Sequence, residues 1–471
     1  MTILFFVFFV LQLLIFLYFM IVNGTYTLLT VISMKDIRDH LNTKSERSIK
    51  NIMSTAFYRP LSIIVPAHNE QKIIATTVKS LLSLSYPEYE IIVVDDGSTD
   101  STMEELIRNF RLVRVEKPIS IVLQHEPVTA VYYSLDYENL TVVGKNNGGK
   151  SDALNAGINF SRFPLFCSID ADSLLENDAL LLAARHFVED REVVATGGIV
   201  RVLNGCTLED GEVTLVKAPK KAIECFQAVE YTRSFLSGRT SWSFLGSLLI
   251  ISGAFAIFRK DMVMAIEGFR KTVGEDMDIV VRLHRHCRQN RIRYKILFVP
   301  DPVCWTQVPA DLKSLLKQRN RWHRGLIDSL WKNRGMLFNP RYGKVGFIGY
   351  PFFFFIETLG PAVEFLGYSL FVVLFFLGWI NTEFVLLFFF LAIIWGMWLN
   401  LGSIILDNMI YRRYDRVGDL LKLFLFGLLE YLGYRQLIVV ERCLATILFW
   451  RKGWGKAKRQ EMKDEVVSKT A

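Results

Sequence analysis

Two acidic clusters could do chemistry, and each stands directly after a short apolar run. Asp95 and Asp96 are adjacent, so their carboxylates repel one another and need hydrogen-bond donors. A nucleobase edge and ribose hydroxyls would supply such donors. Asp170 and Asp172 form a D-x-D pair of hard oxygen ligands, which suits Mg²⁺ or Mn²⁺ beside a diphosphate. Together the clusters predict a site for a nucleoside diphosphate and a divalent metal ion.

A glycine-rich loop lies between the two clusters. Residues 144–151 read G-K-N-N-G-G-K-S and match the P-loop pattern G-x-x-x-x-G-K-S, so a P-loop NTPase is one hypothesis. That hypothesis leaves the acidic strand ends and the triplet Gly-Glu-Asp at 274–276 without roles. In either case we expect Lys150 to meet phosphate, because the glycines allow close backbone approach.

The apolar runs before these residues are spaced as strand–helix–strand units. Runs 61–65 and 90–94 lie about 25 residues apart, which predicts a parallel sheet. Ligands bind at the carboxyl ends of strands in such sheets. Pro66, Asn69 and Glu70 directly follow the first run, so we expect them at the same sheet edge as the acidic clusters.

The composition indicates a membrane protein. The 471 residues are 51% hydrophobic, with 36 Phe. Residues 1–34 contain an apolar run long enough to span a bilayer, and it lacks the basic start of a signal peptide, so a retained helix is expected. The positive-inside rule places the residues after this helix in the cytoplasm, because five of them are basic: Lys35, Arg38, Lys44, Arg47 and Lys50.

Apolar sequence returns after a predicted soluble domain. The expected divisions are a cytoplasmic domain at 58–335, an interfacial segment at 340–350, about four membrane helices at 351–450 and a basic cytoplasmic tail at 451–471. For that tail to be cytoplasmic, the block 418–450 must cross the membrane twice or not at all. The block carries four charges that either form interhelical salt bridges or line a polar channel: Glu430, Arg435, Glu441 and Arg442.

The net charge and the Cys and His residues limit the kinds of ligand that the protein is expected to bind. The net charge of +8 fits anionic lipid or a phosphorylated substrate, and no basic run with interleaved aromatics indicates nucleic acid. The six Cys lie far apart, which favours reduced thiols over a zinc site or a disulfide framework. His284 and His286 do not share a helix face, so we expect a solvated helix surface there.

Read together, the motifs match one family. The chain resembles the family 2 inverting membrane glycosyltransferases, which include poly-N-acetylglucosamine, cellulose, chitin and hyaluronan synthases. The resemblance covers about residues 58–335. It is carried by these motifs in order: Pro66-x-x-Asn69-Glu70, Asp95-Asp96-Gly97-Ser98-x-Asp100, Asn147-x-x-Lys150, Asp170-x-Asp172, Gly274-Glu275-Asp276 and Gln318-x-x-Arg321-Trp322.

The resemblance implies an α/β GT-A (Rossmann-like) domain attached to transmembrane helices. By it, Asp276 is the general base on the acceptor hydroxyl, and Glu275 and Trp322 bind the acceptor sugar. Gln318 and Arg321 hold the pyrophosphate. Glu275 beside Asp276 would also raise the pKa of the base.

The remaining motif residues are expected on the donor side. Donor contacts are assigned to Pro66, Asn69, Glu70, Asp95, Asp96, Lys150 and Asp170, and metal contacts to Asp170 and Asp172. Relatives often carry Thr-Glu-Asp or Gly-Asp-Asp where this chain has Gly274-Glu275-Asp276. The Asp is retained, so the resemblance still implies Asp276 as the base.

The expected reaction is transfer of a hexose or N-acetylhexosamine from a UDP-sugar to a growing β-linked polysaccharide. The donor favoured by the resemblance is UDP-N-acetylglucosamine (UDP-GlcNAc) or UDP-glucose (UDP-Glc), and translocation of the product is expected. The alternative is transfer of one sugar to a lipid-linked or lipid acceptor. The location implied is the plasma membrane, multi-pass, with membrane lipid and an accessory export subunit as candidate partners.

Overall fold

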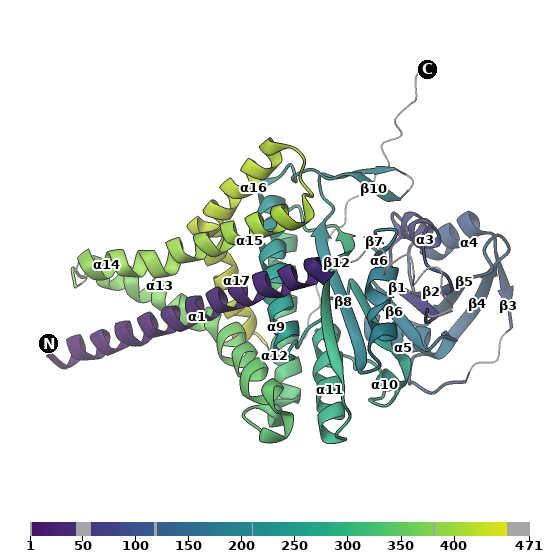
Figure 1. Ribbon diagram of the computed structural model, residues 1–471, viewed down its shortest axis with the longest axis horizontal. Helices are drawn as coiled ribbons and strands as arrows, with labels where there is room; N and C mark the ends of the chain where they lie inside the picture. The colour runs from purple at the N-terminus through teal and green to yellow at the C-terminus, as the bar shows by residue number, and fades with distance from the viewer. Residues whose placement is uncertain (1, 44–57, 117–119, 210, 380–381, 450–471) are drawn as a thin grey trace, which may run out of the picture.

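The computed structural model describes residues 2–43, 58–116, 120–209, 211–379 and 382–449. Figure 1 shows a sheet with its helices on one side of the molecule and a set of long helices extending from the other. The basic residues Lys44, Arg47 and Lys50 and the tail 451–471, used above to orient the chain, lie outside the described residues.

A ten-stranded mixed sheet forms the centre of the catalytic domain. Its central strands are parallel and lie in the order β5 (Leu140–Lys145), β2 (Tyr89–Asp96), β1 (Leu61–Ala67), β6 (Leu165–Ile169). Most of their residues are buried apolar side chains, which is why the sequence shows continuous apolar runs rather than alternation. The predicted parallel sheet is therefore confirmed.

Further strands complete the sheet at both ends, with mostly antiparallel pairing. The order is β3-β4-β5-β2-β1-β6-β11-β8-β12-β7. The bounds of the added strands are β3 (Leu112–Val115), β4 (Val128–Ser134), β7 (Ser173–Leu175), β8 (Val193–Val202), β11 (Phe255–Arg259) and β12 (Lys295–Thr306). A separate hairpin is formed by β9 (Thr207–Glu209) and β10 (Glu212–Leu215).

The order of the central strands explains where a ligand can bind. The chain adds β2 and then β5 on one side of β1, and later places β6 on the other side. A crevice opens outside the carboxyl ends of the strands where the order reverses. This topology brings the loop after β1 beside the loop after β6, as the predicted Rossmann-like α/β fold requires.

The helices of the catalytic domain follow the strands in turn. They are α3 (Ile74–Leu82), α4 (Thr102–Phe110), α5 (Lys150–Phe160), α6 (Ala179–Ala184), α7 (His186–Glu189), α8 (Ala222–Thr232), α9 (Thr240–Phe244), α10 (Lys260–Met264), α11 (Glu275–Gln289) and α12 (Leu312–Lys332). A π-helical turn, η1 (Arg233–Arg239), joins α8 to α9.

The first helix is longer than predicted. α1 runs without interruption from Thr2 to Thr43, about 63 Å at ~1.5 Å per residue. Its first half is apolar and exposed in the isolated chain, whereas Leu29 and Ile37 of its second half are buried. Ser241 of α9 donates a hydrogen bond to the carbonyl of Leu29, so α1 is packed directly onto the catalytic domain.

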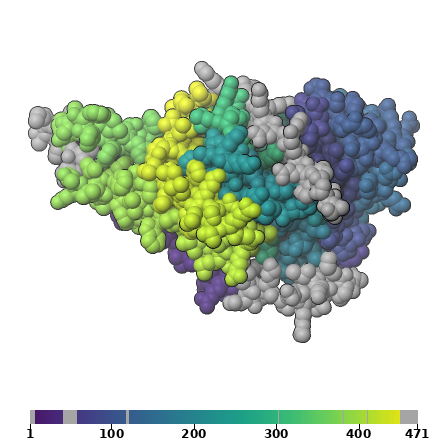
Figure 2. Space-filling model, turned by 90° about the horizontal axis from the view of Figure 1, so that it is seen from above, coloured from purple at the N-terminus to yellow at the C-terminus, as the bar shows by residue number. Residues whose placement is uncertain are grey.

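Four helical segments are long and apolar enough to cross a membrane: Phe6–Asp39, Val345–Phe376, Thr382–Met409 and Val417–Ile447. They include α1, α13 (Gly360–Phe376), α14 (Thr382–Phe389), α15 (Trp395–Tyr411), α16 (Val417–Leu429) and α17 (Arg435–Ile447). These segments indicate a membrane location. In Figure 2 the yellow C-terminal helices lie between the green helices and the teal part of the catalytic domain.

The last of these segments is broken in its middle. Gly433 has φ +133° and interrupts helical geometry between α16 and α17. Each half has 13 residues, about 20 Å, which is short of the ~30 Å hydrocarbon thickness. α16 packs on α8 and α15, whereas α17 packs on α12 and α13, so both halves contact the catalytic domain.

Some sequence expectations about exposure are wrong. His284 is buried rather than solvated: its Nε2 bonds the carbonyl of Leu248 and its Nδ1 bonds the hydroxyl of Tyr294, both at 2.8 Å. Burial lowers the pKa of His284 to about 4. The polar face of α11 faces the core at this position because these two partners satisfy the imidazole. All six Cys are free thiols, as expected.

The stretch 231–239 packs between the catalytic domain and the long helices. Phe235 and Leu236 are buried, and Ser33 of α1 donates a hydrogen bond to the carbonyl of Leu236. Ser237 bonds Ser403 of α15 at 3.0 Å. These hydrogen bonds connect the stretch to α1 on one side and to α15 on the other.

Candidate active site

A single cavity of about 1520 Å³ collects most of the predicted site residues. It begins at the carboxyl ends of β1 and β6 and extends to residues of α1, α13 and α17. The predicted residues that line it are Pro66, Asn69, Glu70, Asp96, Lys150, Asp170, Asp172, Glu275, Asp276, Gln318, Arg321 and Trp322. Asp95 is not among the lining residues.

Lys150 links three parts of the cavity. It stands at the first position of α5, and its Nζ lies 2.6 Å from Asp170 Oδ1 and 2.9 Å from Glu275 Oε1. Burial alone would lower the pKa of Lys150, but the carboxylates of Asp170 and Glu275 outweigh it and raise the pKa above its usual value. Lys150 is therefore a permanent cation at the place where the D-x-D pair meets α11.

Asp170 and Asp172 supply part of a binding site for a divalent metal ion. Asp170 and Asp172 both line the cavity, and two carboxylates plus substrate phosphates are a common oxygen set for Mg²⁺ or Mn²⁺. Among the described residues, no three His, Cys, Asp or Glu side chains form a group that could hold a metal ion. The phosphates of a donor would have to complete such a site.

Asp276 lies in the first turn of α11, deep in the cavity. Burial raises its pKa to about 6, and the neighbouring charge of Glu275 adds to this. Lys150, the backbone N–H of Met277 and Arg239 act in the opposite direction. A carboxylate with a pKa near 6 can accept a proton close to neutral pH, which suits a general base.

The glycine of the Gly-Glu-Asp triplet has a packing cause. A Cβ added at Gly274 would lie 2.9 Å from the backbone of Gly325 in α12, and a Cβ at Gly325 would lie 2.9 Å from Gly274. The start of α11 and the middle of α12 thus touch through their backbones. A side chain at position 274 would therefore clash with the backbone of α12, and the glycine lets the start of α11 lie directly against that helix.

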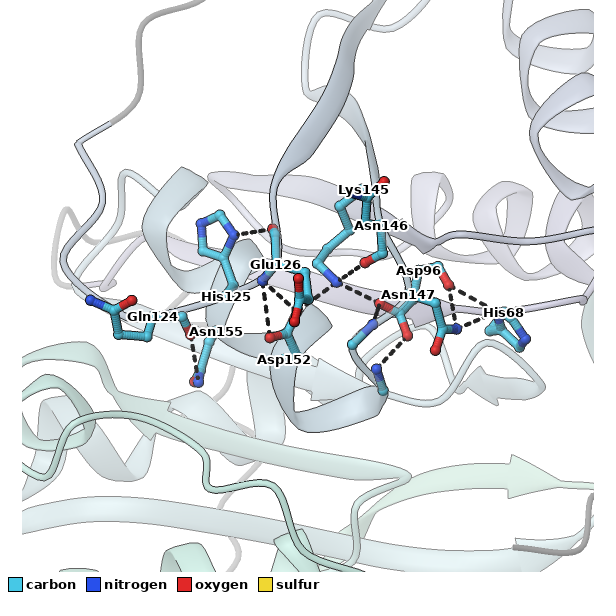
Figure 3. Close-up of polar contacts among 12 residues, drawn as sticks. His68, Asp96, Gln124, His125, Glu126, Lys145, Asn146, Asn147, Asp152 and Asn155 are labelled. Carbon is cyan, nitrogen blue, oxygen red and sulfur yellow. Dashed lines mark hydrogen bonds and ion pairs between the residues drawn. The ribbon is translucent and has the colours of Figure 1, made fainter.

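The P-loop hypothesis is wrong, because the loop's anion-binding groups are already used. The backbone N–H groups of Gly148 and Gly149 donate to the carboxylate of Asp96 at 2.9 and 2.7 Å. Lys145 places its buried Nζ 2.5 Å from both Asp96 and Asp152. Figure 3 shows this cluster, in which a carboxylate of the protein takes the position of a phosphate.

The direct contacts of Asp95 and Asp96 with a nucleoside stay predictions, and both carboxylates already accept hydrogen bonds within the protein. Asp96 lines the cavity but uses its oxygens on the loop before α5, and Asp95 accepts a hydrogen bond from Ser98 and is 6% exposed. The repulsion between the two carboxylates is relieved inside the protein. Their donors are N–H and hydroxyl groups of neighbouring loops, which sequence alone could not assign.

The loop after β1 is tied to the loop after β2. Asn69 adopts φ 59°, its N–H donates to Ser98 Oγ at 2.9 Å, and its Oδ1 accepts from the N–H of Thr99 at 2.7 Å. The N–H of Glu70 donates to Thr102 Oγ1 at 2.8 Å. These bonds fix the donor-side wall of the cavity.

The Gln-x-x-Arg-Trp motif lies on α12, facing the cavity with three of its residues. Arg321 is exposed there, and Trp322 keeps 44% of its surface accessible. Sequence reasoning missed Arg319, whose guanidinium lies 4.4 Å from the ring centre of Trp322 and 2.6 Å from Glu230. The ring of Tyr231 lies 6.3 Å from that of Trp322, so α8 and α12 together form an aromatic wall.

The charged residues of the last helices form salt bridges and also line the cavity. Arg435 pairs with Glu364 at 2.7 Å, and Arg442 with Glu357 at 3.4 Å. All four lie on the cavity wall. Both explanations left open above therefore hold for Arg435 and Arg442. Glu430 pairs with Arg233 and Glu441 accepts a hydrogen bond from Asn320, and neither is among the residues that line the cavity.

Comparison with known proteins agrees with this geometry. Residues 62–266 match the family model "Glycosyl transferase family 2", and residues 165–399 match "Glycosyl transferase family group 2". The fold and site define a glycosyltransferase. The chain belongs to glycosyltransferase family 2.

Curated relatives are poly-beta-1,6-N-acetyl-D-glucosamine synthases. One from Staphylococcus aureus (strain COL) is 27% identical over 291 residues, 62% of this chain and 59% of the relative. One from Staphylococcus epidermidis is 28% identical over 277 residues, 58% of this chain and 56% of the relative. The alignment thus spans less than two thirds of those proteins.

A solved structure also overlaps most of the chain. It is the mannosyltransferase PcManGT from Pyrobaculum calidifontis in complex with GDP-Man and Mn²⁺, with a TM-score of 0.48 and 16% identity over 88% of this chain and 99% of that one.

Proposed function

We propose that the protein is an inverting, processive glycosyltransferase of the membrane. It would transfer an N-acetylhexosamine, or a hexose, from a UDP-sugar to a growing β-linked polysaccharide and pass the product across the bilayer. The relatives named above are poly-N-acetylglucosamine synthases, which favours UDP-N-acetylglucosamine over UDP-glucose as donor.

One observation carries the proposal: the cavity that holds Asp276 is continuous with the space among the membrane helices. Residues of α12, α13 and α17 line the same cavity as the D-x-D pair. An enzyme that adds one sugar to a small acceptor has no need of a wall that extends into the membrane segment. A polymer leaving Trp322 would enter this space directly.

Each side of the site has a proposed task. Asp276 would accept the proton of the acceptor hydroxyl as that oxygen attacks the anomeric carbon. The bond from this carbon to the UDP oxygen would break on the opposite side and UDP would leave, so an α-linked donor would give a β-linked product. Lys150, Gln318 and Arg321 would bind the pyrophosphate by charge-assisted hydrogen bonds. Trp322 would stack on the acceptor sugar.

Asp170 and Asp172 would hold Mg²⁺ or Mn²⁺ with the donor phosphates. When bound, the ion would neutralise charge that develops on the diphosphate. The loops after β1 and β2 would enclose the nucleoside, with Asn69 and Glu70 on the wall and Asp96 supporting Lys150 from behind.

We propose a topology in which the N-terminus is outside and the catalytic domain is cytoplasmic. The helices from Val345 to Phe376 and from Thr382 to Met409 would then cross outward and back. α16 and α17 would enter from the cytoplasmic side and return to it, since each half is too short to cross and both contact the catalytic domain.

Membrane vesicles containing the protein test the proposal when supplied with radiolabelled UDP-N-acetylglucosamine or UDP-glucose. Long labelled polymer sealed inside inverted vesicles is the expected result. A labelled lipid carrying one sugar would replace the proposal with the single-addition alternative.

An Arg321→Lys variant should bind UDP at least about tenfold more weakly and fold normally. Lysine keeps the charge but loses the planar fork that bonds two phosphate oxygens at once. Arg321 is exposed in the cavity, so the fold should be little affected. Calorimetric UDP titration checks this, with Arg108→Lys on α4 as the matched control. Unchanged UDP affinity would place Arg321 outside the donor site.

Activity should also fall on the acid side of pH ~6. Because burial and Glu275 raise the pKa of Asp276 to about 6, the base is ionised above this value and protonated below it. We expect kcat/KM to decline about tenfold per pH unit below 6. In Glu275→Gln the acid limb should move to lower pH, because the neighbouring charge is gone. An acid limb that stays near pH 4 in the wild-type enzyme would contradict this role for Asp276.

A further inference from the structure

Arg239 lines the cavity and forms no salt bridge with a carboxylate among the residues that the structure describes. Four other arginines of the cavity wall are salt-bridged: Arg233 to Glu430, Arg319 to Glu230, Arg435 to Glu364 and Arg442 to Glu357. The Nε and Nη1 atoms of Arg239 are buried, and neither has a hydrogen-bond partner among the described residues. A buried donor left unsatisfied costs free energy, so these N–H groups point to a ligand.

The guanidinium is held in place without using its N–H groups. Arg239 ends the π-helical turn η1, and its guanidinium carbon lies 3.6 Å from the ring centre of Phe235, four residues earlier. A cation on an aromatic face is attracted by the ring and keeps its edge free. Burial lowers the pKa of Arg239 to about 10, so the group stays charged at neutral pH.

The neighbours of Arg239 place it on the acceptor side. The ring of Phe235, on which Arg239 lies, is 5.9 Å from the ring of Tyr231, and that ring is 6.3 Å from the ring of Trp322. No hydrogen bond joins Arg239 to Asp276 in the described chain, so the base keeps its oxygens for the attacking hydroxyl. An acceptor sugar stacked on Trp322 would have one oxygen at Asp276 and another substituent at Arg239.

We propose that Arg239 binds the acetamido carbonyl oxygen of the terminal acceptor sugar and so selects an N-acetylated chain. This inference rests on the proposed function. A guanidinium only donates hydrogen bonds, and an amide carbonyl only accepts them. A de-N-acetylated sugar presents an ammonium group at the same carbon, which Arg239 would repel, and loses the carbonyl as well.

The test compares two acceptors of equal length with UDP-N-acetylglucosamine as donor: an N-acetylglucosamine oligosaccharide and its de-N-acetylated counterpart. The wild-type enzyme should prefer the acetylated acceptor by at least about tenfold in kcat/KM, the scale expected where a site rejects a substrate lacking a bonded group. In Arg239→Met, which keeps the packing on Phe235, the KM for the acetylated acceptor should rise and the preference should largely disappear. Arg108→Met on α4 is the matched control and should behave as wild type.

Titration of UDP into the same variant separates the outcomes. Unchanged UDP affinity with a lost preference supports the inference and shows that the variant is folded. An equal loss for both acceptors, or a loss of UDP affinity, would overturn it and assign Arg239 to the donor or to the fold. If the wild-type enzyme used only glucose donors and acceptors, the inference would be wrong without any test of a variant, because glucose has no acetamido group.

Discussion

An Asp276→Asn variant should lose about 10²–10⁴-fold in sugar transfer, the range typical for a positioned general base. Asparagine preserves the shape of the side chain and its place in the first turn of α11. It cannot accept the proton of the attacking hydroxyl. Donor binding should persist, because Lys150 and Arg321 are untouched. Transfer is measured as labelled sugar incorporated, and binding as the UDP dissociation constant.

The matched control is Asp261→Asn, which changes a carboxylate that is 61% exposed and pairs with Arg259 far from the cavity. It should transfer sugar at the wild-type rate. Turnover of Asp276→Asn near that of the control would show that another group removes the proton. Loss of UDP binding would instead show that the variant has damaged the donor site.

Replacing Lys145 by Met should lower the free energy of unfolding by about 3–5 kcal/mol, the cost of removing one partner from a buried ion pair. The side chain of Lys145 is fully buried and balances both Asp96 and Asp152. Without it, two carboxylates remain in the interior with only backbone N–H donors. The loop from Lys145 to Lys150 would lose the ion pairs of Lys145 with Asp96 and Asp152, so the rate of sugar transfer should also fall.

Thermal unfolding in detergent measures the first effect. Lys79→Met on the exposed face of α3 is the control and should change stability by less than about 0.5 kcal/mol. Adding Asp152→Asn to Lys145→Met removes one uncompensated charge and should recover part of the loss. Stability of the double variant below that of the single one would show that Lys145 does not act through these carboxylates.

The strands could be predicted because their signal is local. The runs ending at Val65 and Val94 are mostly apolar, and the structure extends each by two residues, to Ala67 and to Asp96. The presence of Asp276 and Trp322 in one cavity was an expectation of the family resemblance, because Trp322 lies in the middle of α12 and follows no strand end. These features depend on short stretches of chain.

Features that depend on distant partners could not be predicted. The pairing of Asp96 with Lys145 joins two strands, and the identity of Gly274 depends on Gly325, some 50 residues on. His284 looked solvated because its partners, Leu248 and Tyr294, lie outside its own helix. A polar residue can be buried when the folded chain brings hydrogen-bond partners beside it. The spacing of polar residues along a helix carries no information about such distant partners.

The uninterrupted course of α1 sets the orientation of the catalytic domain. A helix advances about 1.5 Å and turns about 100° per residue, so its two ends keep a fixed rotational phase. One end of α1 carries mostly exposed apolar side chains, and the other carries Leu29 and Ile37 against the domain. In the proposed topology, the number of residues in α1 would set the depth and rotation of the catalytic domain relative to the bilayer, and a single inserted residue would rotate one end of the helix relative to the other.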